Sequence, residues 1–149
     1  MPTYNGGEMP TTAKSYAVDT SVAVAALDSA HAAHAGSLAA VRAHRPALAG
    51  HAAFETISVL TRMPGHLAVA APTAVAIIER VFPEIHWLTP KNALALLARL
   101  GPVGITGGAV YDALVGEAAR TARCILLTRD ERARRTYDLI GVDYRIVPA

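Results

Sequence analysis

Short apolar runs alternate with longer amphipathic stretches along this chain of 149 residues. Apolar runs of a few residues between polar or turn residues are typical of buried strands, whereas apolar residues spaced three and four apart are typical of helices. By these criteria the sequence predicts strands at 16–19, 85–88, 124–128 and 144–147, and a further short strand is possible within 46–50.

The stretches between the apolar runs predict helices, and capping or breaking residues indicate their ends. Asp19 or Thr20 can cap the first helix, Pro90 follows a capping Thr89, and Gly101-Pro102 is expected to stop the helix that begins there. The predicted helices cover 20–28, 32–44, 51–62, 73–82, 90–100, 109–122 and 130–140. Strands that alternate with helices favour an α/β fold with a parallel sheet covered on both faces.

The composition indicates one globular domain. The chain is 52% hydrophobic and 17% charged, and it is long enough to bury a core. Residues 1–14 are polar and contain Gly and Pro without a long apolar run, so we expect a flexible leader rather than a signal peptide. The domain is then expected at 15–149.

Cysteine usage and hydropathy narrow the class of protein. Cys124 is the only cysteine, which excludes an intrachain disulfide and fits a cytoplasmic location. His31 and His34 have helical metal-ligand spacing, but no acid or cysteine completes a zinc site. The longest apolar stretch, 67–78, is too short to span a bilayer, so no membrane partner is expected.

The charge is mildly basic, with a net charge of +2 and a pI of about 8.9. This balance is not that of a protein dedicated to packaging nucleic acid. Arginines nevertheless cluster around Asp130, at positions 129, 132, 134 and 135. A basic rim beside a carboxylate is suited to holding a phosphate backbone.

Four isolated acids, Asp19, Glu55, Asp112 and Asp130, lie beside or within apolar stretches, where an unpaired charge is costly. Asp19 and Asp130 follow predicted strands, and ligands of parallel sheets bind at the carboxyl ends of the strands. A shared pocket of carboxylate oxygens suits Mg²⁺ or Mn²⁺. As alternatives, Asp19 and Asp130 are helix caps, Asp112 forms a buried ion pair with an arginine, and Glu55 is solvated or pairs with Arg62.

Four short motifs carry these acids in order: Val18-Asp19-Thr20-Ser21, Phe54-Glu55-Thr56, Tyr111-Asp112-Ala113-Leu114 and Leu127-Thr128-Arg129-Asp130. Their order and spacing resemble those of the PIN-domain nucleases, and among them the VapC-type toxins of toxin–antitoxin pairs. The resemblance extends roughly from Ser15 to Val147. It implies a three-layer α/β/α PIN-like domain with a short parallel sheet.

The resemblance also implies roles for individual residues. The catalytic set would be Asp19, Glu55, Asp112 and Asp130. Three of these, Asp19, Asp112 and Asp130, would bind the metal, with Glu55 ligating directly or through water. Supporting hydroxyls would come from Thr20, Ser21 and Thr128. RNA-binding side chains would be Arg62, Arg129 and Arg132.

The function expected from the resemblance is metal-dependent cleavage of RNA by a toxin that forms a homodimer and is neutralised by a cognate VapB-type antitoxin. The apolar segments 22–27 and 38–41 would form part of the antitoxin groove. A second possibility is a non-catalytic PIN-like module that binds RNA or protein. A phosphoryl-transfer enzyme or switch is a third, but Ser21 stands where a haloacid-type phosphatase has a second Asp, and Lys91 is poorly placed for a receiver-like switch.

Overall fold

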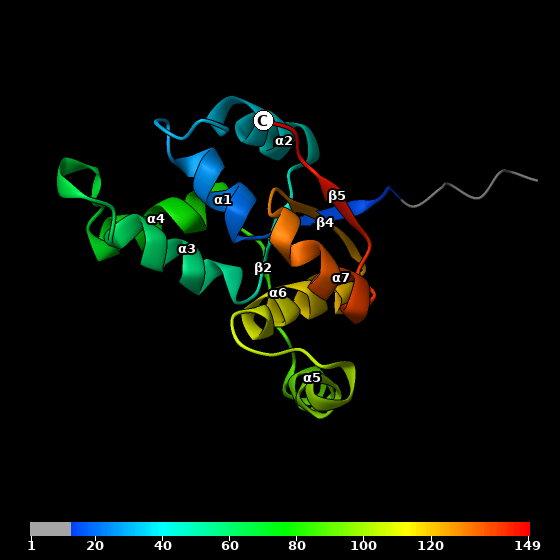
Figure 1. Cartoon of the computed structure of the whole chain (residues 1–149). Coiled ribbons are helices and arrows are strands. Elements are labelled where there is room, and N and C mark those ends of the chain that lie inside the picture. The colour runs from blue at the N-terminus through cyan, green and yellow to red at the C-terminus, as the bar shows by residue number, and fades with distance from the viewer. Residues whose placement is uncertain (1–12) are drawn as a thin grey trace, which may run out of the picture.

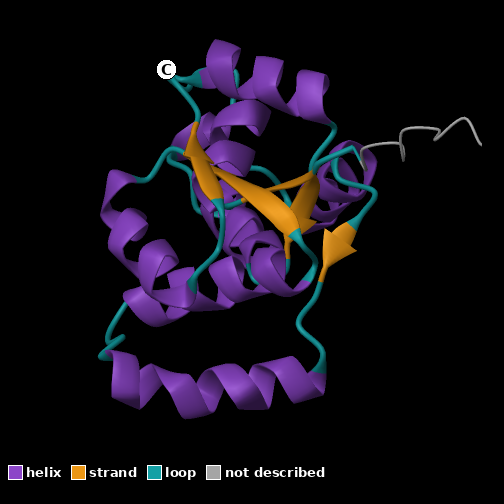
Figure 2. Ribbon diagram, turned by 90° about the vertical axis from the view of Figure 1, so that its right-hand side faces the viewer, coloured by secondary structure: helices purple, strands orange, loops and turns teal. Residues whose placement is uncertain are grey.

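The computed structural model describes residues 13–149, so the predicted leader at 1–14 lies almost wholly outside the described residues. Five parallel strands form one sheet in the order β3-β2-β1-β4-β5. Figure 2 shows this small sheet enclosed by helices. The strands are β1 (Ser15–Val18), β2 (Ala47–Ala49), β3 (Ile85–His86), β4 (Cys124–Thr128) and β5 (Tyr144–Ile146).

The central strands β1 and β4 carry most of the buried apolar residues of the sheet. Every residue of β4 is buried, and Ala17 of β1 pairs with Leu126 on one side and Ala47 on the other. Continuous apolar runs of this kind are typical of parallel strands covered by helices on both sides.

The helices form two layers around the sheet (Figure 1). One layer packs α1 against α2 and α3, and α3 against α4; the other packs α6 against α5 and α7. The first group is α1 (Thr20–Leu27), α2 (His34–His44), α3 (Ala52–Thr61) and α4 (Ala71–Val81), and the second is α5 (Pro90–Val103), α6 (Ala109–Thr121) and α7 (Arg134–Ile140). Short 3₁₀ turns, η1 (Gly65–Leu67) and η2 (Glu131–Ala133), lie between elements. The predicted three-layer α/β/α architecture is confirmed.

Most predicted elements are present, and their ends differ for local reasons. The fifth helix does not stop at Gly101-Pro102, because α5 continues to Val103 and ends at Gly104, whose φ of 73° is left-handed. Proline has a helical φ and costs only one hydrogen bond near a helix end, whereas glycine readily reverses the chain. The possible strand within 46–50 is present as β2.

The strand predicted at 85–88 is shorter in the structure, because β3 ends at His86. Trp87, which follows β3, is 51% exposed. Of the segments 22–27 and 38–41, expected to form part of an antitoxin groove, Val22 and Val41 are buried in the core of the domain. Val24, Leu27 and Leu38 are only partly buried, so the groove stays a prediction for these residues. Within residues 13–149, no helix is both long and apolar enough to cross a membrane.

Candidate active site

Asp19 lies where the central strand β1 passes into helix α1, and it is only 4% exposed. Its Oδ1 accepts hydrogen bonds from the Val22 amide at 3.2 Å and the Ser21 hydroxyl at 2.5 Å. Its Oδ2 accepts from the Thr128 hydroxyl at 2.5 Å and the Tyr137 hydroxyl at 2.8 Å. Burial raises the pKa of Asp19, and the four hydrogen bonds oppose that shift.

The loop after β4 is connected to the end of β1 through two hydroxyls. The Arg129 amide donates to Ser21 Oγ at 2.8 Å, and the Asp130 amide donates to Thr128 Oγ1 at 3.1 Å. Both hydroxyls also donate to Asp19. This network positions the backbone of Asp130 beside Asp19, which gives the predicted supporting residues Ser21 and Thr128 a definite contact.

Glu55 reaches the site from the first turn of α3. The Thr20 hydroxyl donates to Glu55 Oε1 at 3.2 Å and so connects the starts of α1 and α3. Two turns after Glu55, Arg62 Nη1 donates to Ser58 Oγ at 3.4 Å rather than to Glu55. Arg62 therefore keeps its charge beside the pocket without forming the ion pair considered as an alternative for Glu55.

Asp112 enters from the opposite helical layer, in the first turn of α6. Its pKa is raised to about 6, first by burial and then by the charges of Asp130, Glu55 and Asp19. All four acids line one pocket of about 490 Å³. The structure therefore brings together the complete set of carboxylates that the sequence singled out.

Comparison with known proteins identifies the family of this chain. The family model described as "PIN domain" matches residues 16–139, which contain all four acids. The chain belongs to the PIN-domain family. Ribonuclease VapC27 of Mycobacterium tuberculosis (strain ATCC 25618 / H37Rv) is 46% identical over 126 residues, covering 85% of this chain and 92% of that protein. Ribonuclease VapC40 of Mycobacterium tuberculosis (strain CDC 1551 / Oshkosh) is 41% identical over 141 residues, covering 88% and 98%.

A solved structure also shares the PIN fold. The crystal structure of VapBC2 from Rickettsia felis, bound to a DNA fragment from its promoter, aligns with a TM-score of 0.60. The alignment covers 89% of this chain and 98% of that chain. At 16% identity, this likeness supports the fold.

Asp19 and Asp130 are also helix caps, which is the alternative role that the sequence allowed for these two acids. Asp19 Oδ1 caps α1 through Val22, and Asp130 Oδ1 accepts from the Arg132 amide at 2.9 Å at the start of η2. Each cap uses one carboxylate oxygen. A capping role therefore orients the side chain and does not exclude a second role.

The arginines predicted to contact RNA do not all lie at the pocket. Arg62 and Arg132 line it, whereas Arg129 is not among the lining residues. The Nε of Arg129 is buried and makes no hydrogen bond within the described part of the chain. The structure thus favours Arg62 and Arg132 as the cations nearest the acids.

The donor set fits a hard divalent cation, because it consists of carboxylates without cysteine or histidine. As the side chains lie, however, no three His, Cys, Asp or Glu residues within 13–149 are arranged to hold a metal ion. The four carboxylates nevertheless line the same pocket. His31 and His34 instead bond the backbone, at Ala33 and Ala25.

Sequence reasoning missed Tyr137, which extends from α7 to Asp19 and is 1% exposed. Gly116 of α6 leaves room for the ring, because a Cβ there would lie 3.1 Å from Tyr137 Cδ1. Burial first, and then the charge of Asp19, raises the pKa of the Tyr137 hydroxyl, so it remains a donor. An isolated tyrosine in an arginine-rich segment was the available signal.

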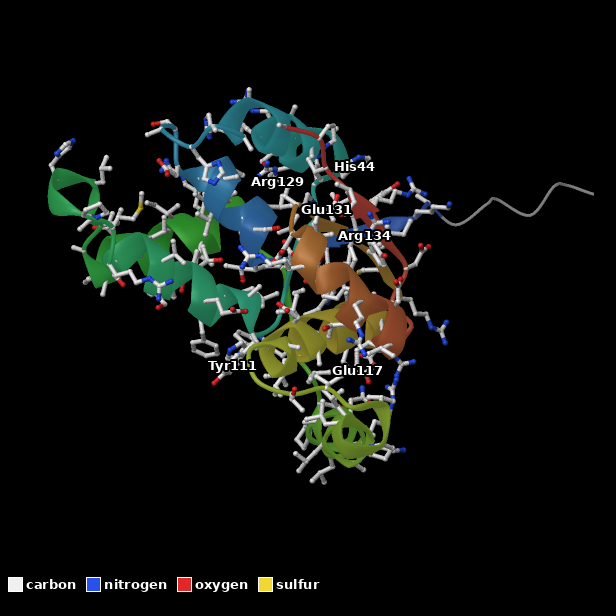
Figure 3. All side chains as sticks on the ribbon, viewed as in Figure 1. His44, Tyr111, Glu117, Arg129, Glu131 and Arg134 are labelled. Carbon is white, nitrogen blue, oxygen red and sulfur yellow. The ribbon has the colours of Figure 1, made fainter. Side chains whose placement is uncertain are left out.

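Glu117 is a buried acid with no part in the pocket. It is 1% exposed and pairs with Arg99 at 2.6 Å and with Arg120. Figure 3 shows Glu117 at the side of α6 that faces α5. Asp112 and Glu117 thus serve different faces of α6, as their spacing predicts.

Aromatic side chains extend the acidic pocket outward. His51, Phe54 and Tyr111 line an adjoining pocket of about 480 Å³ that shares Thr20, Glu55 and Arg62 with it. The rings of His51 and Tyr111 are stacked with centroids 5.3 Å apart, and Tyr111 is 51% exposed (Figure 3). The carboxylates are therefore bordered by flat apolar surfaces as well as by arginines.

Proposed function

We propose that this protein is a divalent-metal-dependent endoribonuclease of the VapC type, a cytoplasmic toxin that cleaves RNA phosphodiester bonds. The observation that carries the proposal is the convergence of four carboxylates from both helical layers on one pocket. Such a cluster is unfavourable without a cation, as the raised pKa of Asp112 indicates. The relatives named ribonucleases support the reaction class.

In the proposed mechanism, some residues of the site bind the metal and others orient these ligands. Asp19, Asp112 and Asp130 hold Mg²⁺ or Mn²⁺, and Glu55 ligates directly or through water. Thr20 orients Glu55, while Ser21 and Thr128 orient Asp19 and the loop that carries Asp130. When bound, the metal lowers the pKa of a water and stabilises charge on the phosphoryl oxygens.

RNA binding falls to the cationic and aromatic border of the pocket. Arg62 and Arg132 lie beside the acids and pair with backbone phosphates. Phe54 and Tyr111 offer exposed rings at the adjoining pocket. Attack by water leaves a 5′-phosphate and a 3′-hydroxyl, which is the outcome we expect on the products.

A VapB-type antitoxin is the proposed inhibitor. The structural neighbour from Rickettsia felis is a VapBC complex, and the VapC relatives match almost their whole length. We also expect a homodimer. Co-expression with a candidate VapB-type antitoxin, followed by purification and mass determination, tests both; a chain that stays monomeric and binds no partner contradicts them.

Cleavage of mixed cellular RNA tests the activity. The protein is incubated with Mg²⁺ or Mn²⁺ and separately with EDTA, and Asp112→Asn serves as the matched variant. Cleavage that requires both metal and Asp112 supports the proposal. If the folded, antitoxin-free protein binds RNA without cutting it, the non-catalytic binding module replaces the nuclease.

A further inference from the structure

The hydrogen bonds of Asp19 use every acceptor position that its carboxylate offers. Two carboxylate oxygens carry about four lone-pair positions in total. The Val22 amide and the Ser21 hydroxyl take two on Oδ1, and the hydroxyls of Thr128 and Tyr137 take two on Oδ2. A cation therefore binds Asp19 only if one of these donors gives up its place.

Three of the four donors are held by additional structure. The Val22 amide belongs to the first turn of α1. The Ser21 hydroxyl also accepts from the Arg129 amide, and the Thr128 hydroxyl also accepts from the Asp130 amide. Removing any of these from Asp19 disturbs a helix start or the loop that carries Asp130.

The Tyr137 hydroxyl differs from the other donors. Within the described part of the chain, Asp19 is its one hydrogen-bond partner. Tyr137 also lines the acidic pocket, so it borders the space that a cation enters. Its bond to Asp19 is the one whose loss leaves the other connections of the site intact.

We propose that the Tyr137 hydroxyl occupies the place of the divalent cation on Asp19 Oδ2 and leaves it when the metal binds. This inference rests on the proposed metal-dependent function. Tyr137 is thus a positioning residue that satisfies a buried carboxylate until the cation arrives.

Tyr137→Phe tests the inference because it removes only the hydroxyl. The ring stays packed against Gly116 and against Tyr144, whose ring centroid is 5.8 Å away. We expect the variant to bind Mn²⁺ roughly threefold to tenfold more tightly than the wild type, since the competing hydrogen bond is gone. A merely structural role predicts the opposite, because loosened packing weakens the site.

Mn²⁺ affinity is measured on the full chain without RNA, by electron paramagnetic resonance of free Mn²⁺. Tyr144→Phe is the matched control: it removes a tyrosine hydroxyl that bonds Asp138, outside the pocket, and leaves the affinity unchanged. The tyrosine absorbance with and without Mg²⁺ is an independent measurement. We expect Mg²⁺ to change this absorbance in the wild type and not in Tyr137→Phe. This spectral change in the wild type also tests the inference if the variant does not fold.

The outcomes separate the inference from the proposed function. Tighter Mn²⁺ binding by Tyr137→Phe supports both. Wild-type binding with equal or weaker affinity in Tyr137→Phe overturns the role of Tyr137 and leaves the metal site standing. Absence of Mn²⁺ binding by the wild type overturns the proposed metal dependence, and the inference with it.

Discussion

At the scale of single residues, Asp112 shows that the charged form of a carboxylate is unfavourable in this site. Its pKa of about 6 in the folded protein lies above the ordinary value of 3.8, because burial and the three other acids disfavour its charged form. The folded state therefore binds more protons than the unfolded state between these two values, and its stability falls as pH rises through that window. Above pH 6 the full cost is present unless a cation offsets it.

This cost predicts the behaviour of Asp112→Asn. In EDTA at pH 7.5 the variant is expected to unfold a few degrees above the wild type, since about 1 kcal/mol shifts Tm by roughly 2–8 °C in domains of this range of sizes. Mg²⁺ raises the Tm of the wild type much more than that of the variant, and the variant does not cleave RNA. Thermal unfolding between pH 4 and 8 measures the effect; parallel curves for the two proteins contradict it.

At the scale of elements, Glu117 connects three helices. It pairs with Arg99 of α5 and Arg120 of α6, and Arg99 also donates to the carbonyl of Ile140 in α7 at 3.1 Å. The carboxylate is buried, while the arginines are partly exposed, so they regain water if Glu117 is lost. The second helical layer, which carries both Asp112 and Tyr137, depends on this contact.

Glu117→Ala is therefore expected to lower the free energy of unfolding by about 2–3 kcal/mol, somewhat less than loss of a fully buried ion pair. The matched control is Glu131→Ala, which removes the exposed ion pair with Arg134 and is expected to change stability far less; both residues are labelled in Figure 3. Urea denaturation measures both. Equal losses in the two variants refute the role given to Glu117.

A second expectation at this scale concerns the contact between α6 and α7. Gly116→Ala places a Cβ 3.1 Å from the buried ring of Tyr137, so the ring must shift. We expect a loss of about 1–2 kcal/mol in stability, as for other overpacked sites. Leu94→Ala, at an exposed position of α5, is the control, and urea denaturation compares them. A fully stable Gly116→Ala protein means that the ring is freer than its packing indicates.

At the scale of the whole molecule, charge is unevenly placed around the pocket. A net charge of +2 is small, so the proposed RNA binding would rely on local cations rather than on the overall field. Arg62 and Arg132 are the arginines that line the acidic pocket. In the proposed function, these positive side chains hold the RNA backbone beside the acids that would hold the metal.

In the Asp112→Asn background, which prevents cleavage, Arg62→Ala and Arg132→Ala are each expected to weaken binding of single-stranded RNA. Each substitution is also expected to make the slope of log affinity against log salt concentration less steep by roughly 0.7, the value for one phosphate contact on a single strand. Arg80→Ala, on α4 away from the pocket, leaves affinity and slope unchanged. Fluorescence anisotropy at several salt concentrations measures this, and equal slopes in all variants contradict it.

Local patterns in the sequence determined the elements and their order. Continuous apolar runs located β4 and β1, and the alternation of runs and amphipathic stretches was sufficient for a parallel sheet between two helical layers. The position of Asp19 after β1 and of Asp130 after β4 then placed two acids at the same edge. These features depend on side-chain period and chain connectivity, which act over a few residues.

The tertiary structure alone decided which side chains share an environment. It brought Asp112 across from the other layer, extended Tyr137 to Asp19, buried Glu117 between arginines and kept Arg129 out of the pocket lining. Hydrogen bonds and pKa shifts depend on distance and burial in three dimensions, and residues more than a hundred positions apart determine them here. The sequence by itself determined which acids are isolated, and only the folded chain decided which donors and charges surround them.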